Sequence, residues 1–332
     1  MASSTVFRNI RIGVESTPGT AVTCPIALPA LEITLAIAGG AGEVFRPAGQ
    51  KHAAFVVPGG DEHTEITVGG KLCYNTLPYL LAGLDYAAPS TVTSGVYKWT
   101  CRPRTASADT YKTFTVQEGA GEATGGQMPW ALFRSLGLDF KRAQIALSGA
   151  GFASKVTDGV SLTTVTKTVT PVPVLGDDIW VYLAASQAAL GTATALSDMS
   201  NVEIHYNDKY GPWWGLNGST DGYADTVERA PDLGGKIMVL NNATGRGYRT
   251  AMRAGDVKWL RIKAVGPIIT GTYSYGLQID APIQFTNPGD REDDDGAYAL
   301  GFNFACKDDS AIDGVNQGAI LVVVTNSLAT LT

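Results

Sequence analysis

Short runs of alternating apolar and polar residues recur along the whole chain. This alternation is typical of half-buried β-strands, and it is clearest over 31–37, 138–147, 202–206 and 298–304. Gly, Pro, Asn and Asp separate the runs and supply turns. The pattern therefore predicts a mainly β protein.

Only two stretches have a helical pattern. In the first, over 76–84, Leu77, Leu80, Leu81 and Leu84 fall at the spacing of one helix face. Pro78 suits the first turn, where its missing N–H would have no partner in any case. The second stretch is a short helix-like patch over 247–255. The sequence thus predicts one short helix in each half of the chain.

A segment of the chain occurs in two versions. Gly-Gly-Lys at 69–71 and again at 234–236 is followed each time by an apolar run, the helical stretch and an aromatic strand containing Trp99 or Trp259. The two triplets are separated by about half of the 332 residues, which favours two related domains in tandem.

The expected fold class follows from this duplication. We predict two tandem β-barrel or sandwich domains, each with one short flanking α-helix, because open apolar sheet edges would aggregate. The predicted boundaries are an N-terminal arm over 1–23, domains over 24–160 and 178–332, and a linker over 161–177.

The segment 39–60 is long for a connection inside a compact domain. It contains the apolar residues Val44, Phe45, Phe55 and Val56. We interpret it as an extended hairpin or arm that docks on a neighbour. A second long loop is expected over 207–231, and its aromatic residues either stack on sugars or, as we favour, form a packed loop or subunit contact. They are Tyr206, Tyr210, Trp213 and Trp214.

Composition excludes several classes of protein. Charged residues make up 17 %, the net charge is −6, and the sequence pI is about 5.1, so no basic surface for gripping phosphates is expected. The four cysteines lack metal-like spacing and are expected to be reduced and buried. The N-terminus has no signal-peptide pattern, and no apolar run approaches the length of a membrane helix.

Catalytic and metal-binding patterns are largely missing. The histidines His52, His63 and His205 have no nucleophile motif near them in sequence. The acidic run at 290–295 does not fit the calcium-loop template, since Arg291 would be its first ligand. We therefore expect no enzyme activity, no cofactor and no metal, and we interpret the acidic run as a solvated turn.

Four motifs together point to a family. They are the opening at 13–21 with Gly13, Glu15, Gly19 and Thr20; the strand and helix at 69–84; the aromatic-Lys-Thr-x-Thr strand at 111–119; and the stretch at 250–267, which is followed by an acidic loop and an alternating Phe strand. With these motifs the chain resembles the tail tube proteins, or major tail proteins, of long-tailed, non-contractile bacteriophages. The resemblance covers most of the chain.

The resemblance implies a structural virion protein without enzymatic activity. Its barrels would form rings, and the rings would stack into the tail tube through which DNA passes without specific binding. A duplicated chain implies three copies per ring with pseudo-sixfold symmetry, or six copies if the second half is a decoration domain. Further partners would be the tape measure, terminator and distal tail proteins. The protein would be made in the host cytoplasm and reside in the virion tail, away from membranes.

Particular residues follow for assembly. Candidate contacts between subunits or rings are Phe7, Val44, Phe45, Phe55, Val56, Trp213 and Trp214. Candidate acidic lumen or loop residues are Asp290, Glu292, Asp293, Asp294 and Asp295. Two alternatives stay open: a β-sandwich glycan-binding module that depends on Trp213 or Trp214, and a β-rich hydrolase that depends on His63 or His205.

Overall fold

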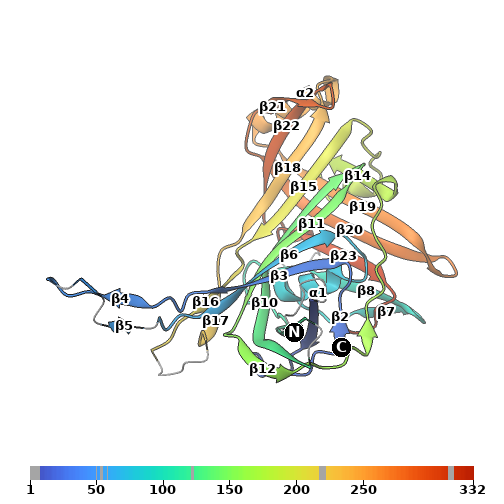
Figure 1. Ribbon diagram of the computed structural model, residues 1–332. Helices are drawn as coiled ribbons and strands as arrows, with labels where there is room; N and C mark the ends of the chain where they lie inside the picture. Colours follow the sequence, from blue (N-terminus) through green and yellow to red (C-terminus); the bar gives the residue numbers. More distant parts are fainter. Residues whose placement is uncertain are drawn as a thin grey trace.

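The computed structural model describes residues 8–49, 51–52, 55–57, 59–120, 123–216, 222–312 and 318–332. Figure 1 shows a mainly β architecture with large sheets and two α-helices in this part of the chain, so the predicted mainly β class is confirmed. The division into two domains is a finer prediction that the strand pairings below do not decide.

The strands follow in chain order. They are β1 Asn9–Val14, β2 Ile26–Ala27, β3 Leu31–Ala38, β4 Glu43–Phe45, β5 Phe55–Val57, β6 His63–Lys71, β7 Ser90–Thr93, β8 Val96–Cys101, β9 Phe114–Gly119, β10 Thr124–Lys141, β11 Ile145–Ala153, β12 Thr157–Ser161, β13 Lys167–Thr168, β14 Ile179–Ala184, β15 Met199–Asn207, β16 Tyr210–Trp213, β17 Asp225–Glu228, β18 Asp232–Leu240, β19 Val257–Thr270, β20 Tyr273–Phe285, β21 Asp290–Asp294, β22 Ala297–Cys306 and β23 Leu321–Asn326. The helices are α1 Leu77–Leu84 and α2 Ala243–Ala254.

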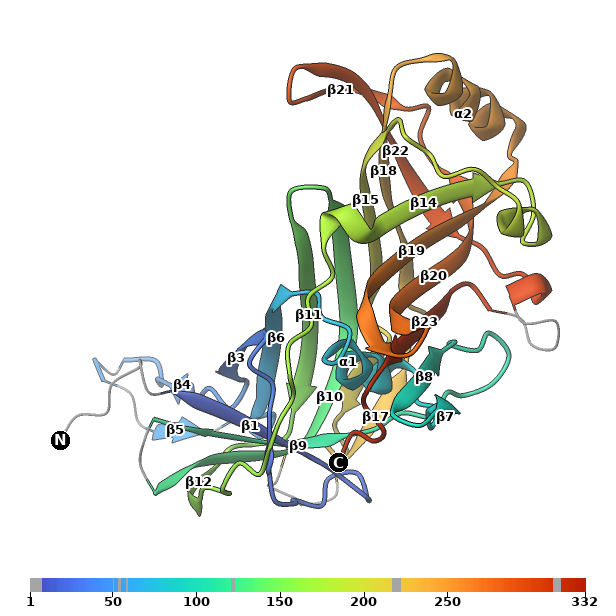
Figure 2. The same cartoon turned by 90° about the vertical axis from the view of Figure 1, so that its right-hand side faces the viewer.

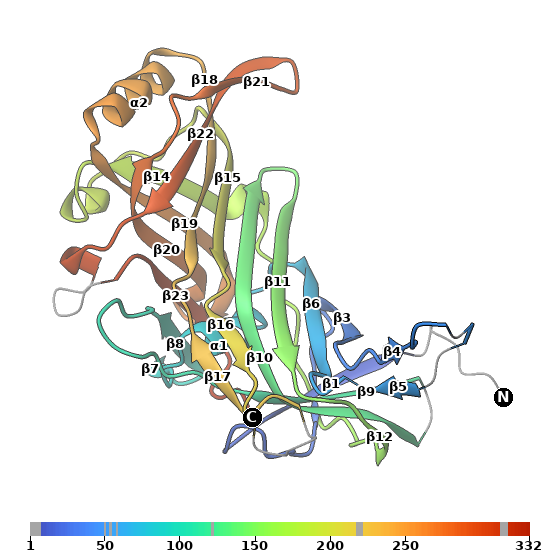
Figure 3. The same cartoon turned by 90° about the vertical axis from the view of Figure 1, so that its left-hand side faces the viewer.

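A long antiparallel sheet runs through both halves of the chain. Its strand order is β3-β6-β11-β10-β15-β18-β22-β21. In Figure 3 the strands β6, β11, β10 and β15 stand side by side in this sheet. The strands alternate between a buried apolar face and a more polar face, which is the period that a one-sided core requires.

Two smaller sheets cover the apolar face of the long sheet. In the first half the order is β13-β2-β1-β9-β10-β12, and in the second it is β14-β19-β20-β23-β8-β7. The last strand of the chain, β23, therefore pairs with β8 of the first half. One apolar core cluster contains residues of both halves.

Strand β10 passes from one sheet to the other. It pairs with β9 up to Ala131 and with β11 from Leu132 onward, with bulges on both sides of this point. Trp130 has a φ of 59° there, an unusual value for a residue with a side chain. The bend lets a single strand contribute to both layers.

The helix α1 confirms the prediction made for 76–84. All eight of its residues are buried, and Figure 2 shows it between β10 and β11 on one side and β8 and β23 on the other. The second predicted helix is also present as α2, whose Asn242 side chain caps the N-terminus by accepting a hydrogen bond from the Gly245 N–H at 2.9 Å.

Three expectations about single elements are wrong. The arm expected over 1–23 contains β1, which pairs along its whole length with β9. The acidic loop expected at 290–295 is largely strand β21. The alternating run at 138–147, expected to be one strand, belongs to two strands, because the backbone reverses between Lys141 and Gln144, which exchange hydrogen bonds at 3.1 and 3.2 Å.

Candidate assembly interface

Eight elements follow one another in the same relative order in the two halves of the chain. In the first half, which we call repeat 1 (residues 9–161), they are β1, β3, β6, α1, β9, β10, β11 and β12; in the second half, repeat 2 (residues 179–326), they are β14, β15, β18, α2, β19, β20, β22 and β23. Strands β2, β7 and β8 of repeat 1 have no counterpart among the described strands of repeat 2. The pairings also recur: β1–β9, β3–β6, β6–β11, β9–β10 and β10–β12 match β14–β19, β15–β18, β18–β22, β19–β20 and β20–β23.

The repeat has a different register from the one that the Gly-Gly-Lys triplets indicate. Strands β6 and β18 have the same length, so that His63 corresponds to Asp232 at one end and Lys71 to Leu240 at the other. We call this alignment of the two repeats the strand register. The first triplet lies at the end of β6, whereas the second lies in the middle of β18. The triplets are therefore not equivalent, although the elements that they mark are.

Repeat 1 and repeat 2 meet at the pairing of β10 with β15. In this junction Leu138 lies opposite Ile204 and Leu136 opposite Tyr206, and all four side chains are buried. The junction continues the long sheet from one repeat into the next without a break. Within the chain, this pairing is the contact through which the two repeats share one sheet.

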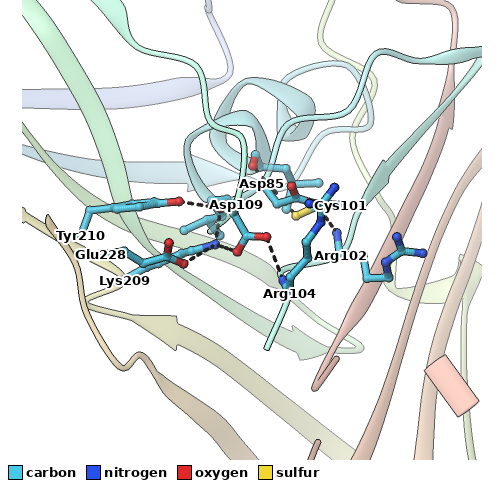
Figure 4. Close-up of polar contacts among 10 residues, drawn as sticks. Asp85, Cys101, Arg102, Arg104, Asp109, Lys209, Tyr210 and Glu228 are labelled. Atoms are coloured by element: carbon cyan, nitrogen blue, oxygen red, sulfur yellow. Dashed lines mark hydrogen bonds and ion pairs between the residues drawn. The ribbon is translucent and has the colours of Figure 1, made fainter. Parts of the chain in front are cut away.

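A buried ion pair supports the junction from the core side (Figure 4). The Lys209 ammonium of repeat 2 contacts the Asp109 carboxylate of repeat 1, and their side chains are 1 % and 0 % exposed. Lys209 also donates to the Leu84 carbonyl at the C-terminal end of α1, where cations are favoured. The Glu228 carboxylate lies 3.7 Å from its Nζ.

The surroundings of this pair are poorly solvated. Burial raises the pKa of the Asp85 carboxyl, which accepts a hydrogen bond from the Arg102 N–H at 2.8 Å. Burial likewise raises the pKa values of Tyr206 and Tyr210. A lysine in such a place is stable only with its acceptors in position. No local pattern in the sequence indicates this pair, because Lys209 and Asp109 are far apart in the chain.

The counterpart of β15 in repeat 1 has an open edge. Strand β3 pairs with β6 on one side, and no described strand pairs with its other side. In the strand register, Ile37 of β3 corresponds to Tyr206 of β15. Ile37 is 65 % exposed, whereas Tyr206, covered by β10, is 6 % exposed.

The counterpart of the β10 edge is open as well. Asp294 pairs with Ala297 across a two-residue turn, as Lys141 does with Gln144. Strand β21 thus corresponds to the end of β10, with Asp294 in the place of Lys141. In the part of the chain that the structure describes, β21 pairs with β22 alone. The chain therefore has two unpaired strand edges, β3 and β21. Their counterparts, β15 and β10, pair with each other inside the chain.

The polar face of the long sheet is acidic. By strand alternation it carries the acids Glu32, Glu65, Asp139, Glu203, Asp232, Asp290, Glu292 and Asp294, against the bases Lys71, Arg134, Lys141 and Lys236. Several of these form ion pairs, such as Lys236 with Glu292 at 2.7 Å and Lys141 with Asp139 at 3.0 Å. The hydrogen bond and charge of Asp139, followed by the charges of Glu203 and Asp294, raise the pKa of Lys141 against the effect of burial.

Two of the family-like motifs contact each other through Glu15. Its carboxylate accepts hydrogen bonds from the Thr113 and Thr115 hydroxyls at 2.7 and 2.8 Å. It also accepts from the N–H groups of Trp130 at 2.8 Å and Gly19 at 3.0 Å. The opening at 13–21 is thereby fixed to the strand at 111–119. The glutamate is a structural residue at the bend of β10.

The two long loops contain hairpins in equivalent positions. The expected hairpin within 39–60 is present as β4–β5, and Val44, Phe45, Phe55 and Val56 are exposed on it. The rings of Phe45 and Phe55 stack with centroids 4.9 Å apart. In Figure 1 this hairpin projects from the body of the protein. Its docking on a neighbour stays a prediction.

The hairpin β16–β17 of repeat 2 packs on repeat 1. Tyr210 and Tyr223 are buried in a cluster with Leu132 and Phe152. Trp214 packs edge-on against Tyr223 and His63, whereas Trp213 is 52 % exposed. Most of the aromatic group predicted in this loop is therefore a packed loop.

The remaining candidate residues are scattered. His63 lies 3.2 Å from Glu65, and His205 lies 3.2 Å from Asp232. His52 and Asp295 are exposed, and Phe7 lies outside the described residues. Cys24, Cys73 and Cys101 are buried free thiols, and Cys306 is half-buried. Within the described ranges, no group of three or more His, Cys, Asp or Glu side chains is arranged to hold a metal ion.

Two comparisons with known proteins give no match. No model of a known protein family matches the chain, and no curated protein matches it either. Neither helix of the described part of the chain has the length and apolar character needed to cross a membrane.

Proposed function

We propose that this chain is a self-assembling structural protein that forms the tail tube of a long-tailed, non-contractile bacteriophage. Three copies would make a ring of six repeats, and rings would stack into a tube. The observation that carries the proposal is the pair of open edges, β3 and β21, whose counterparts β15 and β10 bind each other within the chain. A head-to-tail contact of this kind forms closed rings when its rotation closes.

The internal junction supplies a register for the contact between copies. Val202 pairs with Phe140 and Ile204 with Leu138. When β3 takes the place of β15 and β21 that of β10, Ile33 of one copy lies opposite Asp293 of the next. Strand addition of this kind gains affinity from main-chain hydrogen bonds. The charged side chains of β21 protect its edge from unspecific pairing before assembly.

The acidic face of the long sheet supports the tube proposal. In a closed ring, the long sheets of the copies would form a continuous inner wall with this face toward the channel. Excess negative charge disfavours binding of nucleic acid phosphates. Such a wall would let DNA slide past without being held. The proposal includes no enzymatic step.

A substitution at the open edge tests the proposal. Ile37→Lys changes an exposed side chain, so the isolated chain should keep its stability, but the lysine would be buried in the contact between copies. We expect the wild-type protein to form rings or tubes in negative-stain electron microscopy and Ile37→Lys to form none. Val92→Lys, an apolar exposed position on β7, is the control and should assemble. Assembly of all three proteins, or of none, would contradict the proposal.

A further inference from the structure

The helix α1 fills the space beneath the β10–β15 junction. Its Leu81 and Leu84 side chains line a residual cavity together with Ile204 and Tyr206 of β15. Leu136 and Leu138 of β10 and Ile279 of β20 are among the other residues that line it, and its volume is about 20 Å³. Within the chain, therefore, helix α1 of repeat 1 packs beneath strand β15 of repeat 2 and fills the space there.

The equivalent space in repeat 1 is an open groove. It has a volume of about 440 Å³ and lies against Leu35 and Ile37 of β3, Met128 of β10 and the start of β12. In the strand register, Leu35 and Ile37 are the counterparts of Ile204 and Tyr206. The strands β10 and β12 are the counterparts of β20 and β23. The groove therefore lies beside β3 in the same way that the space filled by α1 lies beside β15, but no described helix fills it.

The helix α2 is the counterpart of α1 but is mostly exposed. Only Gly245 and Ala251 are buried among its residues. Tyr248 packs on Phe285 and Phe302 at ring distances of 5.8 and 6.2 Å and so faces the core. The opposite face is exposed and basic, with Arg246, Thr250 and Arg253 at helical spacing.

The groove carries the complementary charge. Glu118 and Asp158 lie in its wall together with Arg8, which forms an ion pair with Glu118. Two acids against one base leave the wall with a net negative charge. We propose that α2 of one copy docks in the groove of the next copy, with Arg246 and Arg253 against these acids. This inference rests on the proposed function, because it places α2 at the same contact as β21 and β3. Helix α2 and strand β21 of one copy would then both contact the next copy, the strand by pairing with the open edge of β3 and the helix by filling the groove beside β3.

The site that α1 fills and the groove proposed for α2 differ in polarity, and this difference suits a contact that forms only during assembly. The α1 site is apolar and permanently filled. The α2 face and the groove are exposed and charged, so that each copy stays soluble until a second copy covers them. Charge pairs at a rim steer association and select the partner.

Charge reversal on α2 tests the inference. The variant Arg246→Glu plus Arg253→Glu would place like charges together in the groove. We expect it to stay folded, because both side chains are exposed, and to raise the concentration needed for ring or tube formation by about tenfold or more. The matched control is Lys98→Glu plus Lys307→Glu, which makes the same charge change at two exposed positions elsewhere. This control should assemble like the wild type.

A cross-link gives a second readout. Arg253→Cys plus Asp158→Cys should form an intermolecular disulfide in mild oxidant, while each single variant should not. If wild type and the α2 variant assemble alike and no cross-link forms, the docking inference is overturned and the proposed function stands. If the wild type itself never assembles, the proposed function fails, and the inference fails with it.

Discussion

At the scale of single residues, the junction between the repeats depends on Lys209. Its ammonium is surrounded by the Asp109 and Glu228 carboxylates and the Leu84 carbonyl. Breaking a buried ion pair by removing one partner leaves an uncompensated charge in a place that water does not reach. This clamp should therefore contribute to stability far more than the ion pairs on the sheet surface do.

The variant Lys209→Met tests this clamp. We expect it to lower the free energy of unfolding by about 3–5 kcal/mol, since Asp109 would remain buried without its cation. The control Lys141→Met breaks the exposed pair with Asp139 and should cost less than about 1 kcal/mol. Both are measured by chemical denaturation. Equal costs for the two variants would show that Lys209 does not clamp the junction.

Asp85 makes a prediction about pH. Its pKa is raised by burial, so the folded state holds the proton to a higher pH than the unfolded state does. The free energy of unfolding therefore falls as the pH rises from the pKa of Asp85 in the unfolded chain to its pKa in the folded protein. Above the folded-state pKa, the full cost of burying the charged carboxylate is present. Asp85→Asn removes this cost and keeps an acceptor for the Arg102 N–H. Relative to wild type, the variant should gain stability as the pH rises from below to above the pKa of Asp85 in the folded protein, measured as free energies of unfolding over a pH series. A difference in stability between the two proteins that stays constant over the whole pH series would refute the assignment.

At the scale of elements, the sequence predicts those helices and strands whose apolar residues follow a regular local spacing. Helix α1 follows from its leucine spacing, and β15 and β22 follow from alternation. The turn between Lys141 and Gln144 escapes prediction because it contains no Gly, Pro, Asn or Asp. Strand β21 has the composition of a loop because its residues are all charged, and only its pairing with β22 reveals the strand.

The hairpins differ in environment although they occupy equivalent positions. Because β16–β17 packs on the neighbouring repeat, β4–β5 should pack on a neighbouring copy. Deleting residues 42–56 removes an exposed apolar hairpin, so the chain should stay folded and soluble but fail to polymerise. Circular dichroism and electron microscopy measure the two outcomes. Normal tubes from the deletion variant would contradict this role for the hairpin.

At the scale of the whole molecule, the sequence suggests a repeat but does not show how its elements pair. The Gly-Gly-Lys triplets, from which we predict a duplication, lie at positions of β6 and β18 that are not equivalent. Pairings such as β10–β15 and β8–β23 join residues far apart in the chain, and no local pattern encodes them. The open edges of β3 and β21, which carry the functional proposal, can be recognised only once those pairings are known.

The most direct test of the proposed assembly is the symmetry of assembled particles. The purified wild-type protein would be concentrated and imaged by electron microscopy, and end-on views would be averaged. We predict rings of three chains with six similar lobes around a central channel, in which β3 of each copy continues the sheet from β21 of the next. Dispersed single chains at every concentration and salt tested, or rings whose contacts leave both edges open, would contradict this prediction.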